Sequence, residues 1–439
     1  MTGLDRNQTP KTRPMAKRTA LAASLDIGTS KIACMIARLK PCPPSGALRG
    51  RSHAVELIGY SQIQSRGVKA GAVVDLAECE QAVRQAVALA ERMAKVRVES
   101  VLLPVSGGRL QGQLIEAAAD IHGGAVTPAD VTRVTSTGMR HATAAGRTVL
   151  HALPVSYALD GVKGIRDPRG MVARKFGVDM NVVTSDATVA RNLMLVVERC
   201  HLNVEAMAAS PYVAGLSVLT DDEADLGAAV IEMGAGTTTI ATYSGGRFLH
   251  ASGFAVGGHH ITMDLARGLS ACIADAERIK TLYGTVLTGG SDARELMSVP
   301  TAGDNEREVP QIVSRATIAN IVRHRAEEIF EMVRDRLADS PFAAEPKARV
   351  VLSGGASQLV GLVELATQVL GRPVRIGRPL GFGRLPNEAK SASFAVPTGL
   401  LVYPQYAHLE HVEPRHPRQL RTGTDGYFGK VGRWLREGF

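Results

Sequence analysis

The chain has 439 residues, 45% of them hydrophobic and only 4% aromatic, with a formal net charge of +9. That length and apolar content support a large aliphatic core divided over two or more domains, and the charge indicates an anionic partner such as a nucleotide, an anionic membrane or a nucleic acid. No run approaches the roughly 18 apolar residues of a membrane-crossing helix, and none of the five cysteines forms a CxxC pair, which predicts reduced thiols in the cytosol and no metal site.

Residues 1–20 form a basic segment with five lysines and arginines, two prolines and no apolar core. A secretory signal needs an apolar region, so this composition predicts a disordered basic lead. Contact with an anionic surface is a secondary interpretation of the same charges.

A strand–turn–strand pattern follows at residues 22–38, AASLDIGTSKIACMIAR. A short apolar run leads to Asp26, then to the turn Gly28-Thr29-Ser30-Lys31, then to a second apolar run. Glycine in such a turn lets backbone N–H groups approach an anion closely, and hydroxyl groups can add hydrogen bonds to phosphate oxygens.

A Pro/Gly-rich loop at residues 41–50 separates this hairpin from a further β pattern at residues 54–63. The sequence GYSQIQSRGVKAG at residues 59–71 then leads to residues 76–94, where apolar side chains recur on one side of a helix. We expect that helix to pack on a sheet.

Residues 100–183 are interpreted as an inserted subdomain. They begin with SVLLPVSGG, a strand that ends in a glycine turn, and continue with three β patterns and a helix start at Thr127-Pro128. A basic, turn-rich stretch at residues 164–174, GIRDPRGMVAR, predicts a solvated loop or, more sharply, a partner-binding edge.

The stretch at residues 228–247, AAVIEMGAGTTTIATYSGGR, repeats the strand–turn–strand pattern about 200 residues after its first copy, behind an acidic link at residues 221–225. Its turn contains Gly234, Ala235, Gly236 and Thr237. Glu232 precedes the turn, and such a carboxylate can hold the hydrated Mg²⁺ that accompanies a nucleotide. Alone, the stretch predicts an ordinary β-hairpin equally well. The second copy favours two phosphate-binding turns that face each other across one nucleotide.

Two features of the second half bear on the same site. His259 and His260 are interpreted as the lead into a helix and not as a metal site, whereas Glu277 and Lys280 are three apart on one helical face, a spacing typical of an ion pair. Residues 350–361, VVLSGGASQLVG, contain Gly354-Gly355 after an apolar run.

The chain ends with a predicted linker at residues 404–426 and an amphipathic segment at residues 427–439. The apolar members of this segment recur at helical spacing, and three cations take other faces; the set is Phe428, Lys430, Val431, Arg433, Trp434, Leu435, Arg436 and Phe439. This composition predicts a helix that lies in a membrane interface. A helix that docks on its own domain is the alternative.

The two turn motifs and the stretch at residues 350–361 resemble the phosphate and adenosine motifs of the actin, Hsp70 and sugar-kinase superfamily. From about residue 21 to residue 439 the chain resembles, more specifically, the FtsA family of actin-like bacterial cell-division proteins. The segments that carry this resemblance are SLDIGTSK, ALPVSYALDGVKGIRDPRG, VIEMGAGTTTIATYSGG, ADAERIK, VVLSGGASQLVGL and the terminal helix.

The resemblance implies an α/β, actin-like fold, in which two RNase H-like domains flank a nucleotide cleft, with an inserted subdomain 1C and a C-terminal amphipathic helix. The implied division is 1A at residues 21–99 and 184–226, 1C at 100–183, 2A at 227–279 and 331–403, and 2B at 280–330.

The resemblance also implies ATP and Mg²⁺ as cofactors. The implied nucleotide-binding residues are Gly28, Thr29, Ser30, Lys31, Gly234, Ala235, Gly236, Thr237, Glu277, Lys280, Gly354 and Gly355, with Asp26 and Glu232 holding Mg²⁺ through water. The implied partners are the FtsZ C-terminal peptide at 2B, other division proteins at 1C, further copies of the chain in filaments, and an anionic membrane at the cytoplasmic side of the division site. The sequence shows no interleaving of aromatic and basic residues of the kind that binds nucleic acid, so no nucleic-acid partner is predicted.

Four positions depart from the superfamily pattern. Glu232 and Ala235 stand where many members have Asp and Gly, Thr239 stands where many have a second Asp, and Ser210 stands where filament-forming ATPases carry a catalytic glutamate. A general base must reach the attacking water, and no residue is a convincing base here, so we expect at most a slow ATPase. A PilM-like pilus-assembly scaffold and a metabolite kinase of the same superfamily remain as alternatives.

Overall fold

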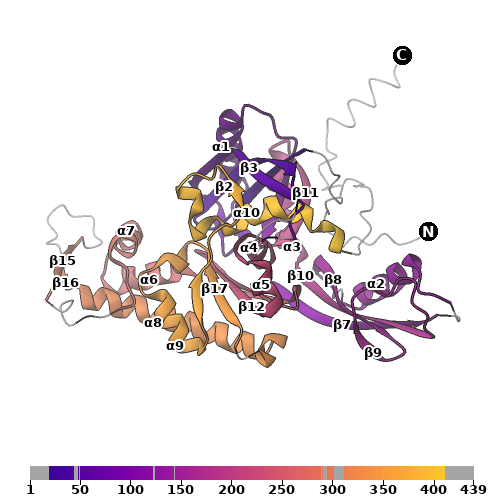
Figure 1. Ribbon diagram of the computed structural model, residues 1–439. Helices are drawn as coiled ribbons and strands as arrows, with labels where there is room; N and C mark the ends of the chain where they lie inside the picture. The colour runs from indigo at the N-terminus through magenta and orange to yellow at the C-terminus, as the bar shows by residue number, and fades with distance from the viewer. Residues whose placement is uncertain are drawn as a thin grey trace, which may run out of the picture.

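The computed structural model describes residues 19–43, 48, 50–121, 124–142, 144–287, 289, 294–300, 311–345 and 347–410. The predicted basic lead, most of the predicted linker and the predicted terminal helix lie outside the described residues. The described part is built on two large sheets, with smaller groups of elements at either end (Figure 1). No helix in this part is both long enough and apolar enough to cross a membrane.

The first sheet has six strands in the order β11-β6-β1-β2-β3-β19. Its strands are β1 (Ala20–Ile27), β2 (Lys31–Pro41), β3 (His53–Gln64), β6 (Ser100–Val105), β11 (Asn203–Ala209) and β19 (Phe382–Gly383). The first three form an antiparallel meander, and β6 and β11 add to β1 in parallel. Helices α1 (Leu76–Ala94) and α3 (Ala187–Arg199) pack together on this domain, and α1 has the bounds predicted from its apolar periodicity.

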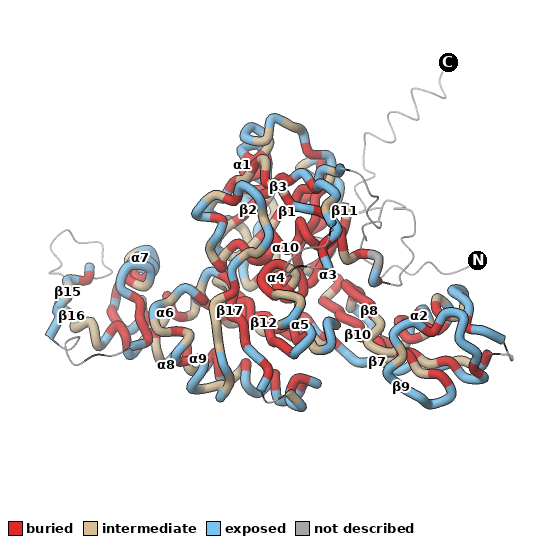
Figure 2. Tube along the Cα trace, viewed as in Figure 1, coloured by how far each residue is buried: buried red, intermediate tan, exposed pale blue. Residues whose placement is uncertain are grey.

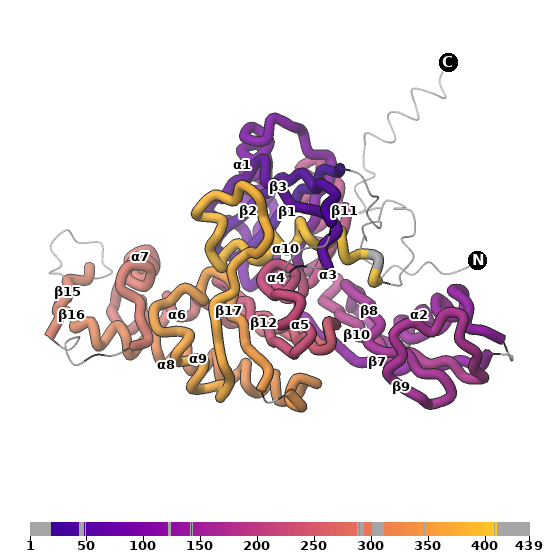
Figure 3. The backbone as a smooth tube through the Cα atoms, in the orientation of Figure 1, coloured from indigo at the N-terminus to yellow at the C-terminus, as the bar shows by residue number. Residues whose placement is uncertain are grey.

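Apolar side chains on both faces of β2 explain why this sheet is covered twice. Cys34 and Ile36 belong to the core shared with α1, whereas Met35 and Ala37 belong to the core shared with α10 (Ala395–Val402). Successive residues of a strand point to opposite faces, so the continuous apolar run of β2 requires cover on each side. Figure 3 shows the yellow C-terminal α10 beside the indigo N-terminal strands.

The second sheet repeats this topology. Strands β12 (Ala228–Met233), β13 (Thr238–Ser244) and β14 (Arg247–Phe254) form an antiparallel meander, and β17 (Arg349–Ser353) and β18 (Val374–Ile376) add to β12 in parallel. Helix α4 (Ser210–Val218) contacts strands of this sheet and packs on α10. Figure 2 shows β12 and β17 as buried strands at the centre of the molecule. The predicted duplication of one design is therefore confirmed in the strand topology.

The insert extends the second sheet. Its strands are β7 (Gln111–Asp120), β8 (Arg147–Leu159), β9 (Val162–Ile165) and β10 (Lys175–Asp186), and β7 joins β14 through one residue pair. Helix α2 (Pro128–Ala142) covers this part, and Thr127 caps its start, accepting a hydrogen bond at Oγ1 from Asp130 N at 3.2 Å. The predicted start of the insert at residue 100 is wrong, because it assigns β6 to the insert. Strand β6 pairs with β1 and β11 and so belongs to the first sheet.

The residues predicted as subdomain 2B lie at the opposite end of the molecule from the insert (Figure 1). This end contains α6 (Gly258–Gly268), α7 (Ile273–Tyr283), α8 (Arg315–Ala338) and a hairpin of β15 (Leu296–Val299) and β16 (Gln311–Ser314). Helix α9 (Leu362–Leu370) packs on α8.

Two local predictions were wrong. The expected acidic link is a short helix, α5 (Asp221–Leu226), because Thr220 and Glu223 form a capping box at its start. The linker expected from residue 404 is wrong for residues 404–410, which are folded: the 3₁₀ turns η5 (Tyr403–Gln405) and η6 (Ala407–Leu409) continue α10, and Pro404, Gln405 and Glu410 are buried. Polar residues at 404–410 are held by distant parts of the chain, which composition alone does not reveal.

Candidate functional site

The first turn joins β1 to β2 tightly. Gly28 N donates to Lys31 O at 3.0 Å, and Ser30 O accepts from Ser65 N at 3.0 Å. A Cβ atom on Gly28 would lie 2.9 Å from Lys31 O, so the turn needs glycine at this position.

The second turn joins β12 to β13 with the same hydrogen bond: Gly234 N donates to Thr237 O at 2.9 Å. Two carbonyl oxygens of this turn accept from the start of α6, Gly234 O from Gly258 N at 2.9 Å and Ala235 O from His259 N at 2.8 Å. The turn is therefore fixed to the N-terminal end of α6, and His259 belongs to a helix start, as its sequence predicted.

The fold brings the two turns into contact. A Cβ atom on Gly236 would lie 2.6 Å from Thr29 Oγ1 and 3.0 Å from the backbone of Ala70. Motifs about 200 residues apart in the sequence thus meet at one place, with Asp26 and Glu232 near the ends of their respective strands. The expected pairing of the two motifs is present in the geometry.

The two carboxylates and one lysine interact electrostatically. Burial raises the pKa of Asp26 to about 6, which Lys31 partly opposes. Burial raises the pKa of Glu232 to about 7, and the charge of Asp26 adds to this rise, while Thr239 Oγ1 donates to Glu232 Oε2 at 3.1 Å and opposes it. Burial also lowers the pKa of Lys31 to about 8, against the attraction of both carboxylates.

The side chain of Lys31 is held by the segment that precedes α10. Its Nζ donates to Ser393 O at 2.7 Å and lies 3.8 Å from the centroid of the Phe394 ring. The ammonium group is therefore fixed between the first turn and the segment that leads into α10.

In the described part of the chain, no three or more His, Cys, Asp or Glu residues gather as a metal-binding group. Asp26 and Glu232 form a pair of carboxylates. Mg²⁺ in nucleotide sites commonly uses one or two carboxylates, with waters and phosphate oxygens completing its coordination, so this pair fits such an ion.

The predicted ion pair on α7 is present, with Lys280 Nζ 2.7 Å from Glu277 Oε2. Thr262 of α6 donates to Glu277, and Lys280 Nζ donates to Thr262 Oγ1 at 2.8 Å and to Gly258 O at 3.1 Å. Burial acts to raise the pKa of Glu277, but the hydrogen bonds from Lys280 and Thr262 outweigh it and lower that pKa. Sequence reasoning missed Thr262, whose signal is its place one helical turn after Gly258.

The structure separates the two glycines after β17. Gly354 has a φ of +87°, and a Cβ atom there would lie 2.4 Å from Met233 O. A Cβ atom on Gly355 would meet only Ser393 Cβ, at 4.0 Å. Gly354 is therefore required by its packing against β12, whereas the space beside Gly355 is open.

Hydroxyl groups occupy the place where hydrolytic relatives are expected to carry carboxylates. Ser210 Oγ lies 3.3 Å from Thr239 Oγ1, and Thr239 in turn donates to Glu232. A serine hydroxyl is a poor general base at neutral pH. The slow hydrolysis expected from Ser210 stays a prediction.

A buried network that the sequence did not predict lies next to Ser210. His151 of β8 accepts at Nε2 from Ala209 N at 2.8 Å, and its Nδ1 therefore donates to Glu410 Oε1, also at 2.8 Å. Tyr403 OH donates to the same carboxylate oxygen at 2.9 Å. The last described residues are thus fastened to the insert and to the start of α4.

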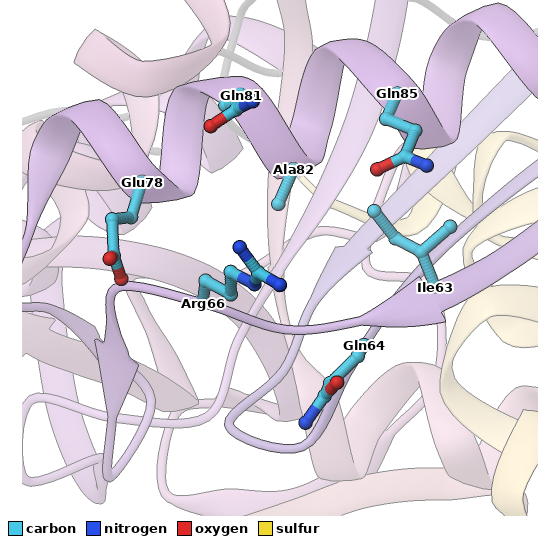
Figure 4. Close-up of a pocket in the computed structure, with 7 residues that line it drawn as sticks. All are labelled: Ile63, Gln64, Arg66, Glu78, Gln81, Ala82 and Gln85. Atoms are coloured by element: carbon cyan, nitrogen blue, oxygen red, sulfur yellow. The ribbon is translucent and has the colours of Figure 1, made fainter.

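A hollow of about 230 Å³ lies between the end of β3 and α1 (Figure 4). Its lining residues are Ile63, Gln64, Arg66, Glu78, Gln81, Ala82 and Gln85. It contains none of the residues predicted for the nucleotide.

Comparison with solved structures defines the class of protein. The fold is similar to that of a chain in the PilM-PilN type IV pilus biogenesis complex, with a TM-score of 0.61 at 17% identity, covering 89% of this chain and 99% of that chain. It is also similar to MreB 5 of Spiroplasma citri bound to AMPPNP, with a TM-score of 0.53 at 13% identity, covering 97% and 100%. The chain therefore has an actin-like fold.

Sequence comparison defines the family. Cell division protein FtsA of Agrobacterium fabrum is 45% identical over 432 residues, covering 98% of each chain, and that of Escherichia coli K12 is 30% identical over 426 residues, covering 95% of this chain and 98% of the relative. Family models for cell division protein FtsA and for the SHS2 domain inserted in FtsA match residues 229–399 and 107–184. The chain belongs to the FtsA family, which confirms the resemblance found in the sequence.

Proposed function

We propose that this chain binds ATP with Mg²⁺ between its two sheets. The observation that carries the proposal is the contact of two turns of one design at Gly236 and Thr29, beside the coupled carboxylates of Asp26 and Glu232. The MreB protein of similar fold is described as bound to AMPPNP, an ATP analogue, which supports a nucleotide in the same class of fold.

In this proposal the phosphates lie between the turns at residues 28–31 and 234–237, and the base and ribose lie near Glu277, Lys280 and Gly355. Asp26 and Glu232 hold the ion through water, and the ion supplies positive charge that compensates the polyphosphate. Lys31 adds a fixed cation. Gly354 contributes indirectly, because it lets β17 approach β12.

Hydrolysis is proposed to be slow. Ser210 and Thr239 provide hydroxyls and no carboxylate at the position that needs a general base. The Ser210→Glu variant tests whether the missing carboxylate limits hydrolysis, and a gain in its ATP turnover over the parent supports that assignment. A parent turnover rate equal to that of fast actin-like ATPases contradicts it.

We propose that the chain polymerises on the cytoplasmic face of the cell membrane at the division site, anchors FtsZ filaments there and helps to recruit later division proteins. Membership of the FtsA family supports this role. The FtsZ C-terminal peptide is assigned to subdomain 2B, where apolar side chains are exposed: Leu282, Tyr283, Leu296 and Ile312. The insert, as subdomain 1C, is assigned to other division proteins.

The membrane anchor is proposed to be the segment at residues 427–439, which lies outside the described residues. Co-sedimentation with anionic liposomes and FtsZ tests the whole proposal, using the full chain and a variant that ends at residue 426. We expect only the full chain to bring FtsZ down with the vesicles. Equal recovery by both would place the anchor elsewhere.

Two other functions were considered. A PilM-like scaffold is supported by similarity of fold alone, at 17% identity. A metabolite kinase would transfer phosphate to a small substrate, and a phosphotransfer screen would reveal it.

A further inference from the structure

A small hairpin lies beside the place where the two turns of the candidate site meet. It consists of β4 (Val68–Lys69) and β5 (Ala72–Val73); β4 and the tip end the stretch GYSQIQSRGVKAG, for which the sequence predicted no role, and β5 follows it directly. Its base is closed by Gly67 O, which accepts from Val74 N at 2.8 Å and from Asp75 N at 3.1 Å. Asp75 then caps α1, accepting from Glu78 N at 3.0 Å. The hairpin is thus held firmly at the point where α1 begins.

The tip of the hairpin has an unusual backbone. Ala70 has a φ of +48° and Gly71 a φ of +72°, so both tip residues lie in the left-handed region, as a tight primed hairpin turn requires. Alanine is uncommon in this conformation. Because a non-glycine residue is kept there, the surrounding contacts must hold the tip in place.

Those contacts reach both turns. Gly71 N donates to Thr29 Oγ1 of the first turn at 3.2 Å, and the Ala70 backbone lies against Gly236 of the second turn, 3.0 Å from the position of a Cβ atom there. On its other side Gly71 packs against Gly107, leaving no room for a side chain. The tip is therefore a third element at the place where the two turns meet.

Lys69 puts a positive charge beside this place. It is exposed and pairs in the hairpin with Ala72, and no carboxylate in the described part of the chain forms an ion pair with it. Burial and nearby cations, Lys69 among them, lower the pKa of His259 at the start of α6, while Glu277 acts in the opposite direction. The charge of Lys69 therefore lies close enough to the start of α6 to act on His259.

We propose that the hairpin is a third phosphate-binding element, in which Lys69 contacts the terminal phosphates of a nucleoside triphosphate. This inference rests on the proposed nucleotide function and adds a residue and a specificity to it. An ammonium group is a compact point charge that suits phosphate oxygens. Because the tip touches both turns, Lys69 would distinguish nucleotides by their number of phosphates, with ATP most affected and AMP least.

Calorimetric titration of the full chain with ATP, ADP and AMP, each with Mg²⁺, tests the proposal. We expect Lys69→Ala to weaken ATP binding about tenfold, as loss of one charged contact predicts, to weaken ADP binding less, and to leave AMP binding unchanged. Lys69→Arg keeps the charge and should retain most of the ATP affinity. Lys347→Ala removes an exposed lysine from another surface and is the charge-matched control.

The outcomes distinguish failure of the hairpin proposal from failure of the proposed nucleotide binding. If the parent binds ATP and Lys69→Ala binds it as tightly as Lys347→Ala, the role of the hairpin is refuted and the proposed function stands. If the parent binds none of the nucleotides, both fail. Trypsin provides a second measurement on the unaltered chain: ATP should protect the bond after Lys69 more than AMP does, and equal cleavage with both would overturn the assignment.

Discussion

Replacing Glu232 with glutamine should stabilise the nucleotide-free protein at alkaline pH. The carboxyl group of Glu232 is buried beside Asp26, and burial is the main reason why its pKa rises from 4.5 to about 7. Glutamine keeps the shape and can still accept the hydrogen bond from Thr239, but it carries no charge. The variant therefore removes the buried charge while leaving the packing intact.

The sign and size of the expected difference in free energy of unfolding follow from proton linkage. Between pH 4.5 and about pH 7 the folded protein keeps a proton that the unfolded chain has lost, so the free energy of unfolding falls as the pH rises. A rise in pKa from 4.5 to about 7 corresponds to about 3 kcal/mol, at about 1.4 kcal/mol per unit. We expect Glu232→Gln to match the parent at pH 4.5 and to exceed its stability by up to about 3 kcal/mol at pH 8.

Urea unfolding at several pH values between 4.5 and 8, without nucleotide, measures this difference. Glu331→Gln, which removes an exposed carboxylate from α8, is the control and should follow the parent at every pH. The reasoning would be refuted if Glu232→Gln and the parent lost stability equally between pH 5 and pH 8.

Three further predictions address the anchor, the buried network and the glycines. Trp434→Glu should release the protein from anionic vesicles in a flotation assay while ATP binding is kept; continued flotation would place the anchor elsewhere. His151→Phe should lower the free energy of unfolding by about 3 kcal/mol, because it removes the acceptor of the Ala209 N–H and one of the donors to the buried carboxylate of Glu410; a melting temperature equal to that of the parent would contradict this. Gly354→Ala should destabilise the fold by at least about 2 kcal/mol because of its positive φ and its contact with β12, whereas Gly355→Ala should unfold like the parent but bind ATP less tightly; equal unfolding curves for the two glycine variants would refute the distinction.

Elements whose signal is local were predictable from the sequence. Helix α1 has its predicted bounds because its apolar periodicity, Asp75 cap and terminal turn all agree. The two turns were predictable because glycine and hydroxyl residues follow short apolar runs in the same order twice. That they face each other was inferred from the repetition, and the fold brings Gly236 of the second turn against Thr29 of the first.

Features that depend on distant contacts were not predictable in the same way. The buried state of Glu410 depends on His151, which is 259 residues earlier in the chain. The predicted insert began at residue 100 and so included β6, but that strand pairs with β1 and β11, which only the fold reveals. The tip at Ala70 was missed because alanine gives no sequence signal for a left-handed backbone.

The network around Glu410 has a mechanical consequence. A force applied to the chain at residue 410 would act on the hydrogen bonds of Glu410 to His151 and Tyr403, and His151 in turn accepts from the N–H of Ala209. Ser210 follows Ala209 directly and is hydrogen-bonded to Thr239, the partner of Glu232. Glu410 is therefore linked to the buried carboxylate of Glu232 through these hydrogen bonds and one peptide bond, so that a force on the last described residues would be transmitted toward that carboxylate.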